Sequence, residues 1–135
     1  MEWTFDSADV VAASAVRTSF RSLLREVATD DSDIFAADVV YGELVGNAIR
    51  HAGGRVDISL VWLEQGAALR VRDYGDGFLQ PKLRPAEPDA EAGRGLYLAS
   101  HFADMVHVAR VPTGGAELTV VLPVWRSETV VVGRG

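Results

Sequence analysis

The chain has 135 residues, of which 48% are hydrophobic and 24% are charged, so it can bury the core of one domain and keep a charged surface. It has no cysteine, which excludes disulfides and thiolate metal sites, and its net charge of −6 argues against sequence-independent binding to nucleic acid. No apolar run reaches the roughly 18 residues of a membrane helix, and the first residues lack the order of a signal peptide, so we expect a cytoplasmic protein without membrane contact.

The chain opens with a predicted strand and a long helix. Trp3 and Phe5 alternate with polar residues, which is typical of a half-buried edge strand. Asp6 and Ser7 are the caps that we expect for a helix over residues 8–28. The apolar positions that recur at helical spacing in this segment are Val10, Val11, Ala15, Phe20, Leu23, Leu24 and Val27.

A second helix and a hairpin follow. Residues 29–33 are rich in Asp, Ser and Thr, so they break the first helix and cap a second one over residues 34–52. Two glycines at 53–54 close that helix. Alternating apolar residues predict two strands, over residues 56–62 and 67–72, joined by a tight turn.

The remaining chain predicts a loop, a helix and two more strands. Residues 78–92 contain three prolines and no periodicity, which is typical of a long loop or lid. We expect a helix over residues 93–104 and strands over residues 105–111 and 116–122. Residues 124–135 form a tail that either adds an edge strand or is disordered.

The predicted element order is β-α-α-β-β-lid-α-β-β, with helices and strands in groups. This grouping favours an α/β two-layer sandwich, in which helices cover one face of a mixed, mostly antiparallel sheet. A doubly wound nucleotide-binding fold would alternate strands and helices instead. We therefore assign residues 1–123 to a single domain.

The second predicted helix carries a polar pair beside its apolar stripe. Glu43 and Asn47 lie one turn apart, so they would point together to the rim of the sheet. Asn offers a neutral oxygen to a hard cation such as Mg²⁺, and Glu can accept a proton from an attacking hydroxyl. A solvated polar stripe has the same pattern, so both interpretations stay open at this point.

A carboxylate continues the apolar face of the strand at 67–72. Asp73 has the parity of the inward-facing residues, and a carboxylate in that position is costly unless it has a partner. The exocyclic amine of adenine is such a partner. Gly75 and Gly77 lack side chains where a base or ribose could approach the backbone. A plain Asp-Gly turn would explain the same residues.

The start of the helix at 93–104 could bind phosphate. Gly93 and Gly95 flank Arg94 at a loop-to-helix junction, where free backbone N–H groups attract anions. A flexible hinge is the alternative, and Arg94 could reach phosphate or solvent. Lys82 and Arg84 in the lid could close over a γ-phosphate. The chain has no Gly-rich loop ending in Lys-Ser or Lys-Thr, which excludes a P-loop.

Three segments in this order resemble the motifs of the Bergerat-type, or GHKL, ATPases, which include gyrase, the large heat-shock chaperone, histidine kinases and mismatch-repair ATPases. Residues 43–51 resemble the N box, residues 73–77 the first glycine box and residues 93–96 the second. The resemblance covers the chain from the first strand to about Leu122. Within that superfamily the chain looks most like the anti-sigma-factor serine kinases, because the domain begins almost at residue 1 and its second glycine box is similar to theirs.

The resemblance implies ATP and Mg²⁺ as cofactors and gives each motif residue a role. Asn47 would hold Mg²⁺, Glu43 would be the catalytic base for an acceptor serine, and Asp73 would hold adenine. The other nucleotide-binding residues that it implies are Arg50, Gly75, Gly77, Gly93, Arg94, Gly95 and Leu96. Glu91 is a departure, because sporulation-type members have an arginine at this lid position. A γ-phosphate contact must then come from Arg94, Lys82 or Arg84, or be missing, which bears on kinase activity more than on ATP binding.

The function implied is that of an anti-sigma factor and ATP-dependent serine kinase. It would bind a sigma factor, phosphorylate a STAS-domain antagonist and form a homodimer, without direct contact to nucleic acid. One alternative is a non-catalytic module that sequesters a partner, which the intact pair of Glu43 and Asn47 disfavours. Another is the catalytic domain of a histidine kinase, which would need a helical partner that carries a histidine. A neighbouring STAS-domain gene or response-regulator gene would separate these alternatives.

Overall fold

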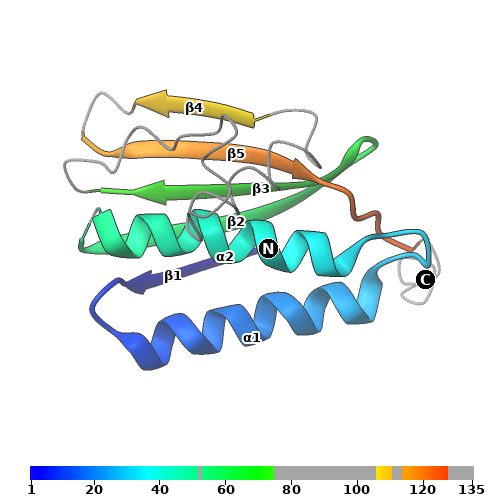
Figure 1. Cartoon of the computed structure of the whole chain (residues 1–135), viewed down its shortest axis with the longest axis horizontal. Helices are drawn as coiled ribbons and strands as arrows, with labels where there is room; N and C mark the ends of the chain where they lie inside the picture. Colours follow the sequence, from blue (N-terminus) through cyan, green and yellow to red (C-terminus); the bar gives the residue numbers. More distant parts are fainter. Residues whose placement is uncertain (52, 75–105, 111–113, 128–135) are drawn as a thin grey trace, which may run out of the picture.

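A computed structural model describes residues 1–51, 53–74, 106–110 and 114–127 of the chain. In this part, two helices lie against one face of a five-stranded sheet (Figure 1). The elements in chain order are β1 (Glu2–Asp6), α1 (Val10–Val27), α2 (Ile34–His51), β2 (Arg55–Leu63), β3 (Gly66–Asp73), β4 (Val106–Arg110) and β5 (Ala116–Leu122). The predicted α/β two-layer sandwich is thereby confirmed.

The sheet has the strand order β1-β2-β3-β5-β4, and each of its four pairings is antiparallel. The register of the β2–β3 hairpin places Val56 opposite Asp73 and Asp57 opposite Arg72. Because successive residues of a strand point to opposite faces, Val56 and Asp73 face the helices, whereas Asp57 and Arg72 face away from them. This alternation decides which residues can belong to one site.

The start of α1 differs from the sequence prediction. Asp9 caps the helix, since its carboxylate accepts a hydrogen bond of 3.0 Å from the Ala12 N–H, and the helix begins at Val10. The prediction that Asp6 and Ser7 are the caps is therefore wrong. Asp6 instead accepts a hydrogen bond of 2.8 Å from the Ala8 N–H, which holds the turn between β1 and the helix.

The apolar face of α1 is also narrower than predicted. Val10 and Val11 are 76% and 80% exposed, and Ala15 is exposed too. The helix buries Val16, Phe20, Leu24 and Val27. Extending this stripe towards the N-terminus by steps of three and four residues leads to Ala12 and Ala13, which pack partly buried against the core. Val10 and Val11 lie on the other side of that first turn.

The core lies between the two helices and the inner face of the sheet. The ring of Phe20 stacks on Tyr41 at 4.4 Å between centroids, and Trp3 of β1 meets Phe20 edge-on at 6.3 Å. On α2 the predicted apolar stripe of Ala37, Tyr41, Leu44 and Ala48 is buried. The helices are thus fixed by contacts with the sheet and with each other.

The strand predictions hold to within one or two residues, and β5 has the predicted bounds. After β5, Val124 is fully buried, and the Trp125 N–H donates to the Ser32 hydroxyl at 2.8 Å. Residues 124–127 therefore pack on the domain. The predicted lid at 78–92, the helix at 93–104 and the last eight residues lie outside the described part. Neither described helix is both long enough and apolar enough to cross a membrane.

Candidate nucleotide-binding site

The end of α2 and the end of β3 lie at the same edge of the sandwich (Figure 1). Helix α2 contacts β3 and β5. After α2, Gly53 and Gly54 adopt φ values of +71° and +79°, a left-handed conformation that turns the chain directly into β2. Because Val56 of β2 is opposite Asp73, this short connection brings the last turns of α2 near the carboxyl end of β3. The segment that resembles the N box ends at this edge, and the one that resembles the first glycine box begins there.

Glu43 is a partly buried carboxylate on the polar stripe of α2. Its Oε1 atom is buried and has no hydrogen-bond partner among the described residues. Burial raises the pKa of Glu43, although the positive charges of Arg50 and Arg17 counteract this rise. A carboxylate with a raised pKa binds a proton more strongly, which suits a general base. The group is thus chemically able to take the role that the sequence predicts.

Asn47 is buried one turn further along, and Arg50 holds it. The Nη2 atom of Arg50 donates a hydrogen bond of 2.7 Å to the side-chain oxygen of Asn47. The guanidinium folds back over Gly46, where an added Cβ would lie 3.1 Å from the Arg50 Nη1 atom. The amide oxygen that the sequence assigns to Mg²⁺ therefore already accepts from a cationic group. Arg50 links Asn47 electrostatically to Glu43.

An arginine cluster that the sequence analysis missed joins α1 to this stretch of α2. Asp38 accepts two hydrogen bonds from Arg21, at 2.9 and 3.1 Å, and two from Arg17, at 3.3 and 3.4 Å. Burial alone would raise the pKa of Asp38, but the two guanidinium groups hold it below its ordinary value. Arg17 also lies 5.6 Å from the ring centroid of Tyr41 and close over Gly42. Gly42, in the middle of α2, is the feature of the sequence that could have indicated this close approach of the Arg17 guanidinium to the helix.

Asp73 is fully buried at the carboxyl end of β3, on the face that α2 covers. The parity prediction for this carboxylate is therefore confirmed. The turn before β5 also approaches this strand end, because a Cβ added to Gly115 would lie 2.9 Å from the Asp73 carbonyl carbon. The backbone of Asp73 is thus held closely between two neighbouring segments. Its contact with adenine stays a prediction.

The other predicted site residues cannot be placed. Gly75, Gly77, Gly93, Arg94, Gly95 and Leu96, with the lid residues Lys82, Arg84 and Glu91, lie outside the described part of the chain. In the part that is described, no three His, Asp or Glu side chains gather as a metal site. An amide oxygen and a carboxylate on one helix face fit a cation that completes its shell with phosphate oxygens and water, as Mg²⁺ does.

Comparison with known proteins identifies the family. Residues 7–122 match the histidine kinase-like ATPase domain. The chain belongs to this family. The match spans all three motifs, so the predicted Bergerat-type resemblance is confirmed at the level of the superfamily, and the protein is an ATP-binding domain of the GHKL type.

Two known proteins are similar to this chain. The signal transduction histidine-protein kinase AfsQ2 of Streptomyces coelicolor is 31% identical to this chain, over 64% of the chain and 19% of that protein. The chain thus spans about a fifth of the length of this curated relative. Among solved structures, the histidine kinase AdeS of Acinetobacter baumannii has a TM-score of 0.49 and 16% identity, over 91% of this chain and 68% of that chain.

Proposed function

We propose that this domain binds ATP with Mg²⁺ at the edge formed by α2 and the end of β3, and that it transfers the γ-phosphoryl group to a side chain of a partner protein. The observation that carries the proposal is the placement of two groups. Glu43 keeps a buried carboxylate oxygen without a hydrogen-bond partner among the described residues, one turn before the buried amide of Asn47. A module that only held a partner would have no need of such a base.

The roles follow from the chemistry of each group. When bound, Mg-ATP supplies the phosphoryl group and a metal charge that offsets the charge of the phosphates. Asn47 would offer its amide oxygen to the metal once Arg50 releases it, and Arg50 would then be free to meet a phosphate. Asp73 would accept from the exocyclic amine of adenine. Glu43 would take the proton of an acceptor that must lose one as it attacks.

The leading candidate for the acceptor is a histidine on a helical partner domain. This proposal is supported by the relative AfsQ2, which is a histidine kinase, and by the family to which the chain belongs. A neutral imidazole has a free lone pair, so it can attack phosphorus without first losing a proton. The histidine would be supplied by another domain or another protein.

The second candidate is a serine of a STAS-domain antagonist, in which case the domain would also bind a sigma factor and act as a homodimer. Glu43 favours this alternative, because a serine hydroxyl must give up its proton as it attacks. A carboxylate with a pKa raised by burial is suited to receive that proton. The two candidates therefore differ in whether transfer needs Glu43.

Titration with ATP and Mg²⁺ by calorimetry tests the nucleotide site first. We expect saturable binding at one site, which Asp73→Asn abolishes and the matched exposed substitution Asp30→Asn leaves unchanged. Thermal melts of each variant separate loss of binding from loss of fold, and Asn47→Ala replaces Asp73→Asn if the latter does not fold. Absence of binding by the folded wild-type protein would contradict the proposal.

Radiolabelled ATP then identifies the acceptor. The substrates are a purified histidine-bearing helical domain and a purified STAS-domain protein. A label that acid removes is a phosphohistidine, whereas a label that survives acid is a phosphoserine. We expect Glu43→Gln to abolish transfer to serine and to spare ATP binding. If neither protein becomes labelled, the domain is a nucleotide-binding module without kinase activity.

A further inference from the structure

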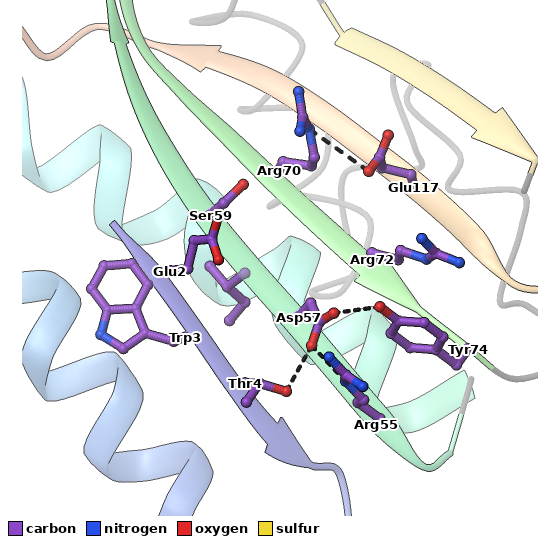
Figure 2. A pocket seen from close by; sticks show the side chains of 11 residues that line it. Glu2, Trp3, Thr4, Arg55, Asp57, Ser59, Arg70, Arg72, Tyr74 and Glu117 are labelled. Atoms are coloured by element: carbon purple, nitrogen blue, oxygen red, sulfur yellow. Dashed lines mark hydrogen bonds and ion pairs between the residues drawn. The ribbon is translucent and has the colours of Figure 1, made fainter.

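The sheet has a second polar site on the face that points away from the helices. A hollow of about 390 Å³ lies there, lined by residues of β1, β2, β3 and β5 (Figure 2). This volume is in the range of ligand-binding pockets. No described helix covers this face (Figure 1). The hollow is separate from the nucleotide site, which lies on the helix-covered face of the same sheet.

Tyr74 organises one end of the hollow. The guanidinium carbons of Arg72 and Arg55 lie 4.3 Å and 4.9 Å from the centroid of its ring. Its hydroxyl donates to Asp57, which also accepts from the Arg55 Nε atom at 2.9 Å and the Thr4 hydroxyl at 2.6 Å. Asp57 is therefore occupied by three donors, and Arg55 already has its counter-ion (Figure 2).

Among the described residues of the hollow, Arg72 is the cation without a counter-ion. Its Nε atom is buried and has no hydrogen-bond partner among the described residues, and none of their carboxylates pairs with it. Arg70, two residues earlier on the same face, does pair with Glu117 at 3.7 Å. A buried donor without a partner costs free energy that an incoming acceptor would restore. Among the described side chains of the hollow, the Arg72 guanidinium thus has a donor that an incoming acceptor could satisfy.

The surroundings favour a singly charged carboxylate as this anion. A guanidinium binds a carboxylate through two parallel hydrogen bonds, and the ring of Tyr74 keeps the guanidinium of Arg72 oriented. Glu2, Asp57 and Glu117 also line the hollow, and their negative charges would repel a doubly charged phosphate more than a carboxylate. The unsatisfied donor of Arg72 and the acidic side chains around it therefore favour a carboxylate over a phosphate.

The same face becomes apolar along β2. Val61 and Leu63 are 46% and 42% exposed, and Ala68 lies opposite Val61 in the register. Val61 is four residues from Asp57, which is about 13 Å along an extended strand. A small carboxylate could not span this distance, whereas a protein segment could meet both ends of the face.

We propose that this face of the sheet is a docking site for an acidic segment of a partner protein. An Asp or Glu carboxylate of that segment pairs with Arg72 beside Tyr74, and an apolar side chain about four extended residues away covers Val61 and Leu63. The site does not depend on the proposed kinase function, because it uses none of the nucleotide-binding residues.

NMR of nitrogen-15-labelled protein tests the proposal with the peptide Ac-Asp-Ala-Ala-Ala-Leu-NH₂. We expect saturable shifts of the Arg72 Nε–H signal and of the β2 amides near Val61. The same peptide with Asn in place of Asp should bind about tenfold more weakly, as should the acidic peptide to Arg72→Gln. Arg25→Gln, a matched change at an exposed residue of α1, should have no effect.

Three results would overturn the proposal. The first is equal binding of the acidic and amide peptides, and the second is binding of the acidic peptide to Arg72→Gln as tight as to the wild-type protein. The third is saturation of the Arg72 signal by acetate or inorganic phosphate at the same concentration as the peptide, which would show a simple anion site. A melting curve checks the fold of Arg72→Gln, and Tyr74→Leu, which removes the supporting ring, replaces it if the fold is lost.

Discussion

Gly115 is predicted to support the nucleotide site through the backbone that it touches. Its φ is +90°, and a Cβ added there would lie 2.9 Å from the Asp73 carbonyl carbon and 3.0 Å from the Tyr74 Cα, against roughly 3.5 to 4.0 Å for an ordinary carbon contact. Gly115→Ala thus combines left-handed strain of about 1–2 kcal/mol with overpacking of about 1–3 kcal/mol. We expect a loss of about 2–5 kcal/mol in the free energy of unfolding.

Gly114→Ala is the matched control for this experiment. Gly114 has a φ of +115° but no atom within 4 Å of an added Cβ, so only the backbone strain of about 1–2 kcal/mol applies. Urea unfolding of both variants measures the difference, and ATP calorimetry of the folded Gly115→Ala protein should show weaker binding because the Asp73 backbone has moved. Equal destabilisation by the two substitutions would refute the argument from close approach.

Three further substitutions test the core and the electrostatics around α2. Asp38→Asn should lower the free energy of unfolding by about 1–2 kcal/mol at pH 7. The pKa of Asp38 in the folded protein lies below its ordinary 3.8, so its contribution to the free energy of unfolding is present above pH 3.8 and is lost as pH falls through the folded pKa. Unfolding measured at decreasing pH should therefore make the wild-type protein and Asp38→Asn equally stable. Arg50→Ala should raise the pKa of Glu43 further, measured by carbon-13 NMR, since the charge of Arg50 lowers it; an unchanged pKa would argue against their coupling. Phe20→Ala should cost about 3–5 kcal/mol in denaturant unfolding, whereas Val11→Ala at an exposed position should cost little.

Periodicity predicted most of the described fold. Strands with alternating apolar residues, such as the one over 116–122, are found where expected, because alternation follows directly from burying one face of a sheet. The same rule placed Asp73 on the inner face. The stripe containing Glu43 and Asn47 was predictable for a similar reason, since helix geometry alone brings residues four apart together.

Features that depend on contacts distant in sequence could not be predicted in this way. The clamp between Asp38 and the arginines of α1 depends on how the two helices pack, and nothing local specifies which arginine reaches which carboxylate. The cap of α1 was misassigned because Asp6 and Asp9 are both good capping residues. Only the turn after β1 decides that Asp6 bonds within the turn and Asp9 caps the helix.

The carboxyl end of β3 explains why the sequence indicated one site and not the other. Asp73 was noticeable because a charge at an inward-facing position contradicts the apolar pattern. Arg72 and Tyr74, its neighbours, have the outward parity at which polar residues are expected, so nothing marked them as unusual until the register placed them beside Asp57. One strand end thus carries the carboxylate of the proposed nucleotide site on one face and the cation of the proposed docking site on the other. If a partner bound to Arg72 changes the affinity for ATP by some factor, ATP must change the affinity for that partner by the same factor, so titrating the acidic peptide with and without ATP measures the coupling between the two faces.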